Sequence, residues 1–314
     1  MIRGKPERKF ELIYEMYSRE NNLLNIKWLC EIAGVPRSGY YRWLNAASDR
    51  AEKEEKERLD FVDILDAYNF RGYPKGARSI HMTLLNRKAP KEPRRMNIKK
   101  IRRLMKKYNL FCPIRKPNPY RKILRDMYAG KIAANEVNRE FREHGARAIL
   151  LTDITYIKRC DGKFTYLSTI IDAYTHKALS YAFSDSLEID FVLHTIQQLV
   201  EKHGDELKTD TLIHSDQGSH YTSYAFSDIL KSNNLRQLMS RKANCWDNAL
   251  QESFFDHMKD EIDIHNCSTH KEICEIVEDW IDYYNNERYQ WDLAKLSPSA
   301  FYKYTITGKY PITV

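Results

Sequence analysis

The sequence predicts an α/β protein, in which a mixed five-stranded sheet flanked by helices follows all-α segments. In the first third of the chain, apolar residues recur at helical spacing, as Ile98, Ile101, Met105 and Tyr108 do. From about Ala148 onward, short apolar and β-branched runs alternate with helical stretches. Three neighbouring strands followed by alternating helices and strands are typical of a sheet of mixed direction.

Residues 1–48 are predicted to form a helix-turn-helix-like segment. Helical spacing begins near Phe10, and a second helical patch covers 25–33. A turn around Gly34 then leads into a new helix near Ser38, with Arg and Tyr in its first turn. This is the pattern of a DNA-binding helix-turn-helix, and a plain αα-hairpin would show nearly the same pattern.

Residues 49–125 are predicted to form a basic helical DNA-binding domain that ends in a proline-rich linker. From Arg71 to Arg125 there are 19 Lys or Arg and one acid, so this stretch carries +18 within a chain of net charge +8. A segregated block of one sign indicates a polyanionic partner. The helix expected over 97–110 would present a basic flank to phosphates. Its DNA-contacting residues are predicted to be Lys99, Arg102, Arg103 and Lys106.

Residues 140–314 are predicted to form the α/β domain. Strands are expected at 148–159, 164–174, 177–184, 211–216 and 235–240. Helices are expected at 188–203, 223–234 and 271–288, and from Asp247 or Asn248 to Glu261. Asn248 and Gln251 have the spacing of a capping box.

Three acids of this domain suggest chemistry. Asp153 lies inside an apolar strand and Asp216 ends another, although either Asp alone could simply cap a turn. Glu252 follows Asp216 with 35 residues between them, and 62 residues separate the two aspartates. Converging carboxylates need a cation between them, and hard oxygen ligands suit Mg²⁺ or Mn²⁺. Two such ions are the usual clamp for in-line attack at a phosphodiester.

The motifs "LLTDITYI", "IHSDQGSHYTS", "SRKANCWDNALQESFFDHMKDE" and "YYNNERYQWDLAKLSPSAFY" occur in this order. Over residues 60–310 the chain thereby resembles the OrfB-type insertion-sequence transposases of the IS-three family, whose core is similar to that of retroviral integrases. The resemblance implies an RNase H-like fold, with Asp153, Asp216 and Glu252 as catalytic residues that bind two Mg²⁺ ions, with Mn²⁺ as a substitute. Ala243 and Trp246 depart from the Gly and Tyr usual in the third motif.

Further residues are expected around these acids. Lys259 matches a DNA-contacting lysine of integrase-like cores, although it also fits an ordinary surface lysine. Arg241 and Lys242 are expected to hold the DNA backbone, and His214 and Asn248 to orient the carboxylates or a phosphate. On their own, several other residues would be interpreted as surface residues: Tyr221, Asp256, Asp260 and Glu261. Asp172, by contrast, is interpreted as structural.

The resemblance implies a DNA transposase that cleaves the element's ends and joins each 3′-OH to another strand. A non-enzymatic DNA-binding regulator and a purely hydrolytic nuclease remain alternatives. The expected partner is double-stranded DNA, both terminal inverted repeats and target. At least a dimer is expected in the synaptic complex, and an upstream-frame (OrfA) protein is a further possible partner or fusion.

A cytoplasmic protein, nucleoid-associated when bound to DNA, is expected. The sequence has no apolar run of membrane-spanning length and no signal peptide at its start. The six cysteines contain no CxxC pair, which argues against a disulfide framework or zinc site. They are interpreted as reduced, mostly buried thiols.

Overall fold

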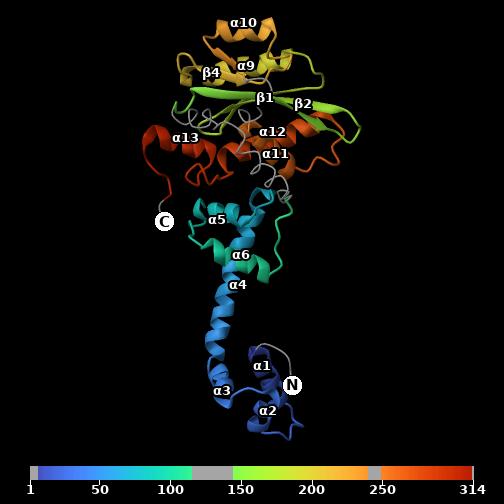
Figure 1. Ribbon diagram of the computed structural model, residues 1–314, viewed down its shortest axis with the longest axis vertical. Helices are drawn as coiled ribbons and strands as arrows, with labels where there is room; N and C mark the ends of the chain where they lie inside the picture. The colour runs from blue at the N-terminus through green and yellow to red at the C-terminus, as the bar shows by residue number, and fades with distance from the viewer. Residues whose placement is uncertain (1–5, 115–143, 240–248, 313–314) are drawn as a thin grey trace, which may run out of the picture. The chain divides into compact units, whose positions relative to one another are not determined.

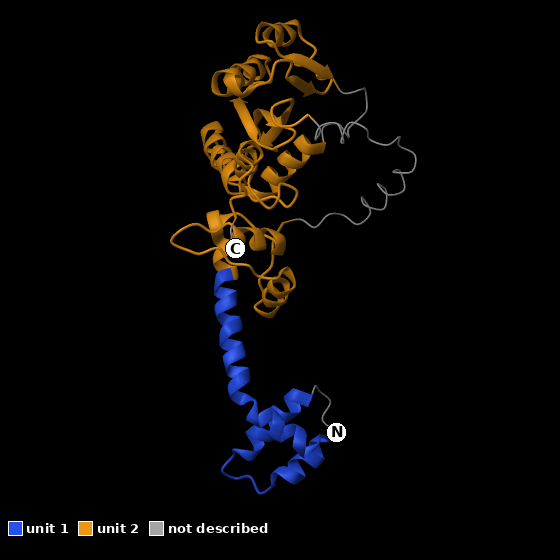
Figure 2. Cartoon of the chain, turned by 90° about the vertical axis from the view of Figure 1, so that its left-hand side faces the viewer, with its two compact units in different colours: residues 1–63 blue, residues 64–314 orange. Residues whose placement is uncertain are grey.

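The computed structural model describes residues 6–114, 144–239 and 249–312. The chain divides into two compact units, residues 1–63 and 64–314 (Figure 2). The three predicted DNA-contacting or capping residues Arg241, Lys242 and Asn248 lie outside the described residues.

Unit 1 is helical. Its helices are α1 (Pro6–Tyr17), α2 (Ile26–Ala33), α3 (Arg37–Asn45) and most of α4 (Ala47–Asn69). The side chain of Asn25 caps α2, and Gly34 ends it with a left-handed φ of 64°. α3 begins three residues later, so the predicted helix, turn and helix are present. Phe10, Leu29 and Tyr40 are buried between these helices.

The charged stretch after this segment is one continuous helix. α4 spans 23 residues from Ala47 to Asn69 and continues into unit 2. Its many Glu, Lys and Arg residues have good helix propensity, which explains the unbroken helix.

The basic segment of unit 2 contains the short 3₁₀ turn η1 (Phe70–Gly72), α5 (Ala77–Leu85) and α6 (Ile98–Lys107). α6 buries Ile101, Leu104 and Met105. Its predicted DNA-contacting side chains are all exposed: Lys99, Arg102, Arg103 and Lys106. The helix therefore has the apolar stripe and the basic flank expected from its sequence.

The rest of unit 2 is built on a five-stranded sheet in the order β3-β2-β1-β4-β5. The strands are β1 (Ile149–Lys158), β2 (Phe164–Asp172), β3 (Ala178–Ser184), β4 (Leu212–Ser215) and β5 (Arg236–Met239). β1 pairs antiparallel with β2, and β2 with β3, whereas β4 is parallel to both β1 and β5. The predicted mixed five-stranded sheet is confirmed.

Helices cover both faces of this sheet (Figure 1). α9 (Asp190–His203) and α10 (Tyr224–Ser232) cover one face, and α11 (Ala249–Glu261) and α12 (His270–Asn286) the other. Leu150 and Ile170 pack in the core of the first face. Ile157 and Leu167 pack with the aromatic residues of α11 and α12 in the second core. Successive strand residues alternate between these two cores, as a pleated sheet requires.

Two further features complete the fold. A short turn η2 (Gly204–Glu206) follows α9, and α13 (Pro298–Thr307), which the sequence did not predict, follows α12. None of the helices in the described ranges is long and apolar enough to cross a membrane.

The described cysteines are all free thiols. Cys30 and Cys267 are buried, Cys112 and Cys274 are half-buried, and Cys160 is exposed. The expectation of mostly buried thiols is therefore wrong for this part of the chain.

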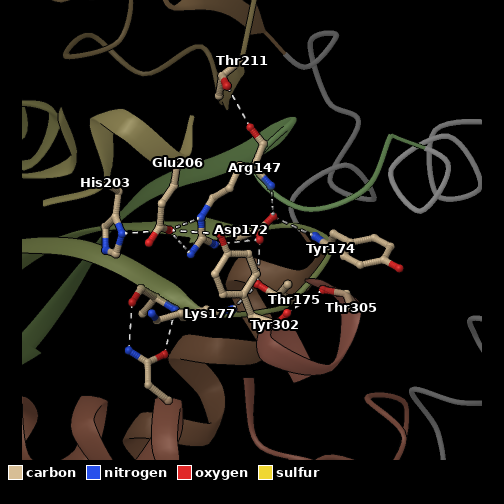
Figure 3. A network of polar contacts seen from close by, with 12 residues as sticks. Arg147, Asp172, Tyr174, Thr175, Lys177, His203, Glu206, Thr211, Tyr302 and Thr305 are labelled. Atoms are coloured by element: carbon tan, nitrogen blue, oxygen red, sulfur yellow. Dashed lines mark hydrogen bonds and ion pairs between the residues drawn. The ribbon is translucent and has the colours of Figure 1, made fainter. Parts of the chain in front are cut away.

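A buried ion pair anchors the start of β1 (Figure 3). Arg147 Nη1 lies 2.9 Å from Asp172 Oδ2, with the two side chains 2% and 0% exposed. Arg147 also pairs with Glu206 at 2.9 Å, and its guanidinium lies 4.1 Å from the centroid of the Tyr302 ring on α13. The structural interpretation of Asp172 is confirmed. Through Arg147, η2 and α13 are held against the end of β2.

Candidate active site

Asp153 lies in the middle of β1 and is half-buried. Leu151 and Ile157, on the same side of the strand by alternation, pack toward α11 and α12. The Asp153 side chain therefore points to the face of the sheet that carries α11. One of its oxygens accepts a hydrogen bond from the Ile154 amide at 2.8 Å.

Asp216 follows the last residue of β4 and is exposed. In the parallel pairing of β1 with β4, Leu151 stands opposite His214. Continuing this register by two residues brings Asp153 opposite Asp216, on the same face of the sheet. Because adjacent strands lie about 4.8 Å apart, the two carboxylates are neighbours.

A tight turn orients the Asp216 carboxylate. Its Oδ1 accepts a hydrogen bond from the Gly218 amide at 2.8 Å, the geometry of an Asx-turn. A Cβ atom on Gly218 would lie 2.9 Å from the same oxygen, so only glycine fits here without displacement. The Asp-x-Gly pattern in the sequence is the signal that could have identified Gly218.

Tyr221 follows Asp216 in the loop after β4 and is 2% exposed, so its interpretation as a surface residue is wrong. It packs against Phe226 of α10 in the core on the opposite face from α11. Burial, and then the negative charges of Asp153 and Asp216, raise the pKa of its hydroxyl well above the usual range.

Glu252 lies in the first turn of α11 and is exposed. The preceding residue, Gln251, is fully buried, and its amide donates a hydrogen bond to the hydroxyl of Thr169 on β2. Thr169 is the cross-strand partner of Asp153. This contact holds the start of α11, and with it Glu252, next to the strand position of Asp153.

The three acids are not gathered into a finished metal site. Across residues 6–114, 144–239 and 249–312, no group of three His, Cys, Asp or Glu side chains could hold a metal ion as it stands. Asp153 and Asp216 are brought together on the sheet, and Glu252 projects from the adjacent helix. The donor set fits a hard divalent cation, because all three side chains offer carboxylate oxygens.

Lys259 lies two turns after Glu252 on α11. Burial lowers the pKa of its ammonium, whereas the charges of Asp256 and Asp153 raise it. The charge of Asp153 therefore reaches Lys259. Lys259, Lys158 and His265 line a cavity of about 440 Å³ between β1 and the end of α11.

The remaining predicted residues lie at different depths. His214 on β4 is 2% exposed, which favours orienting the carboxylates over touching DNA. Asp256 and Asp260 are exposed, as expected.

Glu261 differs from the expectation of a solvated side chain. It is only 5% exposed, it pairs with Arg288 at 2.8 Å, and it accepts a hydrogen bond from the Trp280 indole at 3.0 Å. Its partners are 19 and 27 residues further along the chain, so local spacing could not identify this buried pair.

Comparisons with known proteins agree with this architecture. Two protein-family models, both described as "Integrase core domain", match residues 143–245 and 233–298 of the sequence. The chain is 30% identical over 275 residues to the putative transposase InsK for insertion sequence element IS150 of Escherichia coli (strain K12), covering 87% of this chain and 92% of that protein.

Two other proteins are similar to parts of the chain. The chain is 32% identical over 211 residues to an uncharacterized transposase-like protein of Haemophilus influenzae, covering 66% of this chain and 94% of that protein. The crystal structure of the catalytic core domain of BIV integrase aligns with a TM-score of 0.39 at 15% identity, over 52% of this chain and 99% of that one.

Proposed function

Because the chain belongs to the family of insertion-sequence transposases with an integrase core domain and is thus a DNA transposase, we propose that it cuts its element's ends and joins each 3′-OH to another DNA strand. Asp153, Asp216 and Glu252 are the proposed catalytic residues. The observation that carries this assignment is the register of β1 with β4, which makes Asp153 and Asp216 neighbours. The Gln251–Thr169 contact, which holds α11 beside Asp153, supports the inclusion of Glu252.

These three carboxylates would hold two divalent ions, Mg²⁺ or Mn²⁺. Ions bound there would lower the pKa of the attacking water or 3′-OH and neutralise the charge on the leaving oxygen. Asp153 and Asp216 contribute from the rigid sheet. Glu252 contributes from the start of α11, which the Gln251–Thr169 bond holds beside the sheet.

In each step an oxygen attacks a phosphorus atom of DNA and the bond to the leaving 3′ oxygen breaks. In the first step water attacks and frees the element's 3′-OH. In the second step that 3′-OH attacks another strand, and the number of phosphodiester bonds is conserved. Lys259 would stabilise the phosphate, because its ammonium carries the charge opposite to that of the phosphate and it lies two turns after Glu252 on α11.

Basic residues on the protein surface would bind the DNA that extends beyond this site. The exposed flank of α6 is the proposed backbone contact, with phosphates neutralised by Lys99, Arg102, Arg103 and Lys106. Arg241, Lys242 and Asn248 remain proposed contacts close to Glu252 in sequence. The terminal repeats and a target would be bound together by at least two copies of the chain, with or without an upstream-frame partner.

The test uses the full chain, Mg²⁺ or Mn²⁺, and DNA cut from the flanks of its own gene. The wild-type protein should produce both nicked and joined DNA. Glu252→Gln should lose both products and keep DNA binding, whereas Asp260→Asn, a matched change at an exposed acid of the same helix, should keep both. Nicks without joined products would favour the hydrolytic nuclease, and normal joining by Glu252→Gln would refute the assignment.

A further inference from the structure

A second cavity, of about 570 Å³, lies on another side of α11 from Glu252 and Lys259. Its walls come from α5, from the start of α11 and from the segment that follows α12. Ala249 and Ser253 of α11 line it. Since Ser253 directly follows Glu252, a group bound in this cavity lies within one helix diameter of the proposed catalytic acids.

One wall of the cavity is an aromatic ring surrounded by cations. Trp291 lines the cavity and is 43% exposed. The guanidinium of Arg78 lies 5.8 Å from the centroid of this ring, and the ammonium of Lys295 lies 5.1 Å from it. Both cations lie over the ring, so a nucleobase that stacks on its exposed part has its adjoining phosphate beside them.

The inner part of the cavity is polar and offers hydrogen bonds to a base edge. Ser253, His257 and Gln290 face it with a hydroxyl, an imidazole and an amide. The charge of Arg288, also in the wall, is balanced by its buried pair with Glu261. The mixed donors and acceptors suit a base, which carries both kinds of group on its edge.

The size of the cavity restricts what can enter. Its volume is in the range of pockets that hold one small molecule, and a DNA duplex is far wider. A base can reach Trp291 only when it is unpaired and turned out of the helix. Unpaired nucleotides occur at the ends of cut DNA, which is the substrate of the second proposed step.

We propose that this cavity binds one unpaired nucleotide at the end of the bound DNA, an inference that rests on the proposed function. The base stacks on Trp291, and its phosphate lies beside Arg78 and Lys295. The cavity thereby fixes the DNA end and leaves the 3′-OH of the neighbouring strand to be directed at the acids.

The test measures binding without catalysis. The full chain carrying Glu252→Gln is mixed, without divalent metal, with a short duplex whose single-stranded extension contains 2-aminopurine. The parallel probe is the same duplex with a blunt end and the 2-aminopurine paired. We expect the extended duplex to show quenched fluorescence and to bind about tenfold more tightly than the blunt one.

Variants locate the site. Trp291→Ala should abolish the quenching and the preference for the extension, and Trp291→Tyr should keep most of both because it retains a ring. Arg78→Gln should weaken binding of the extension while preserving the quenching that remains at saturation. If Trp291→Ala fails to fold, as judged by circular dichroism, Arg78→Gln and Trp291→Tyr still decide the matter.

Equal binding of both duplexes by the Glu252→Gln protein, or unchanged quenching in Trp291→Ala, would overturn the inference. Failure of the proposed function would look different. In that case the protein with an intact Glu252 and Mg²⁺ would not cut or join DNA, although the quenching by Trp291 persisted.

Discussion

The side-chain amide of Gln251 on α11 donates a hydrogen bond to the hydroxyl of Thr169 on β2, and both side chains are fully buried. Because Thr169 is paired with Asp153, this bond joins the helix that carries Glu252 to the strand position that carries the first proposed acid. The relative placement of the two acids thus depends on a contact between their neighbours.

Gln251→Leu should destabilise the protein by about 1–3 kcal/mol, because it leaves the Thr169 hydroxyl buried without this donor. Strand joining should fall as well, since α11 loses its tether to the sheet. Urea unfolding and a joining assay measure the two effects. The double variant Gln251→Leu/Thr169→Val should recover most of the stability but not the joining; a single variant that matches wild type in both assays would show that the tether is unimportant.

Gly218→Ala should impair catalysis while leaving the fold intact. The new Cβ would lie 2.9 Å from Asp216 Oδ1 and would displace that carboxylate. A misplacement of about 1 Å costs about a hundredfold in rate when the misplaced group is catalytic. Gly204→Ala is the control, because a Cβ there meets only Val200 at 3.8 Å. Equal joining by both alanine variants would contradict the role given to the Asp216 turn.

Arg147→Met should destabilise unit 2 by about 3–5 kcal/mol, because it leaves the Asp172 carboxylate buried without its cation. The unfolding midpoint in urea measures this. Lys271→Ala breaks the exposed pair with Glu275, 3.8 Å long, and should change stability by less than about 1 kcal/mol. A similar small effect for both substitutions would mean that the buried pair does not anchor β1.

Lys75 makes stability depend on pH. It is 2% exposed, and burial lowers the pKa of its ammonium to about 8, from an ordinary value of 10.5. Between these values the unfolded chain binds more protons at this residue than the folded chain does, so the contribution of Lys75 to stability rises with pH. Below the lower value the cost of the buried charge is fully present.

Thermal unfolding at pH values below and within this window should reveal the effect. Raising the pH from about 7 to about 10 should stabilise the wild-type protein relative to Lys75→Met, which has no titrating group at this position. Melting temperatures of the two proteins that change in parallel over this range would contradict the assignment.

The basic flank of α6 should contribute to DNA affinity through phosphates. Each of the four substitutions Lys99→Gln, Arg102→Gln, Arg103→Gln and Lys106→Gln should reduce the slope of log K against log salt by about 1. The effect should be equal for DNA of any sequence, as fluorescence anisotropy can show. Lys271→Gln, at an exposed lysine of α12, is the control, and an equal change in its slope would refute a specific role for α6.

The sequence predicts the elements of the fold well, because each depends on local periodicity. β1 is an apolar run with an acid in its middle, β4 is an apolar run directly followed by an acid, and both are found where expected. α13 was missed because its exposed, tyrosine-rich sequence shows little helical periodicity; Ser297 and Pro298, which cap its start, are the signal that was available.

The contacts that position the site were not predictable in the same way. Gln251 looks polar and helical, and nothing near it in sequence indicates Thr169, which lies 82 residues away. The interpretation of Tyr221 and Glu261 as surface residues is wrong for the same reason, since their burial depends on packing partners contributed by distant elements. Spacing identifies the acids, and tertiary packing decides which neighbours hold them.

We propose that Asp153, Asp216 and Glu252 act together by binding divalent metal. Replacing the metal-binding group of Glu252 by one that prefers another metal tests this proposal. Glu252→Cys replaces a hard carboxylate by a thiolate, which Mg²⁺ accepts poorly and Mn²⁺ accepts better. Strand joining by this variant should be lost in Mg²⁺ and partly restored in Mn²⁺, whereas Asp260→Cys should join DNA equally in both metals. Full joining by Glu252→Cys in Mg²⁺ would show that Glu252 does not bind the catalytic metal.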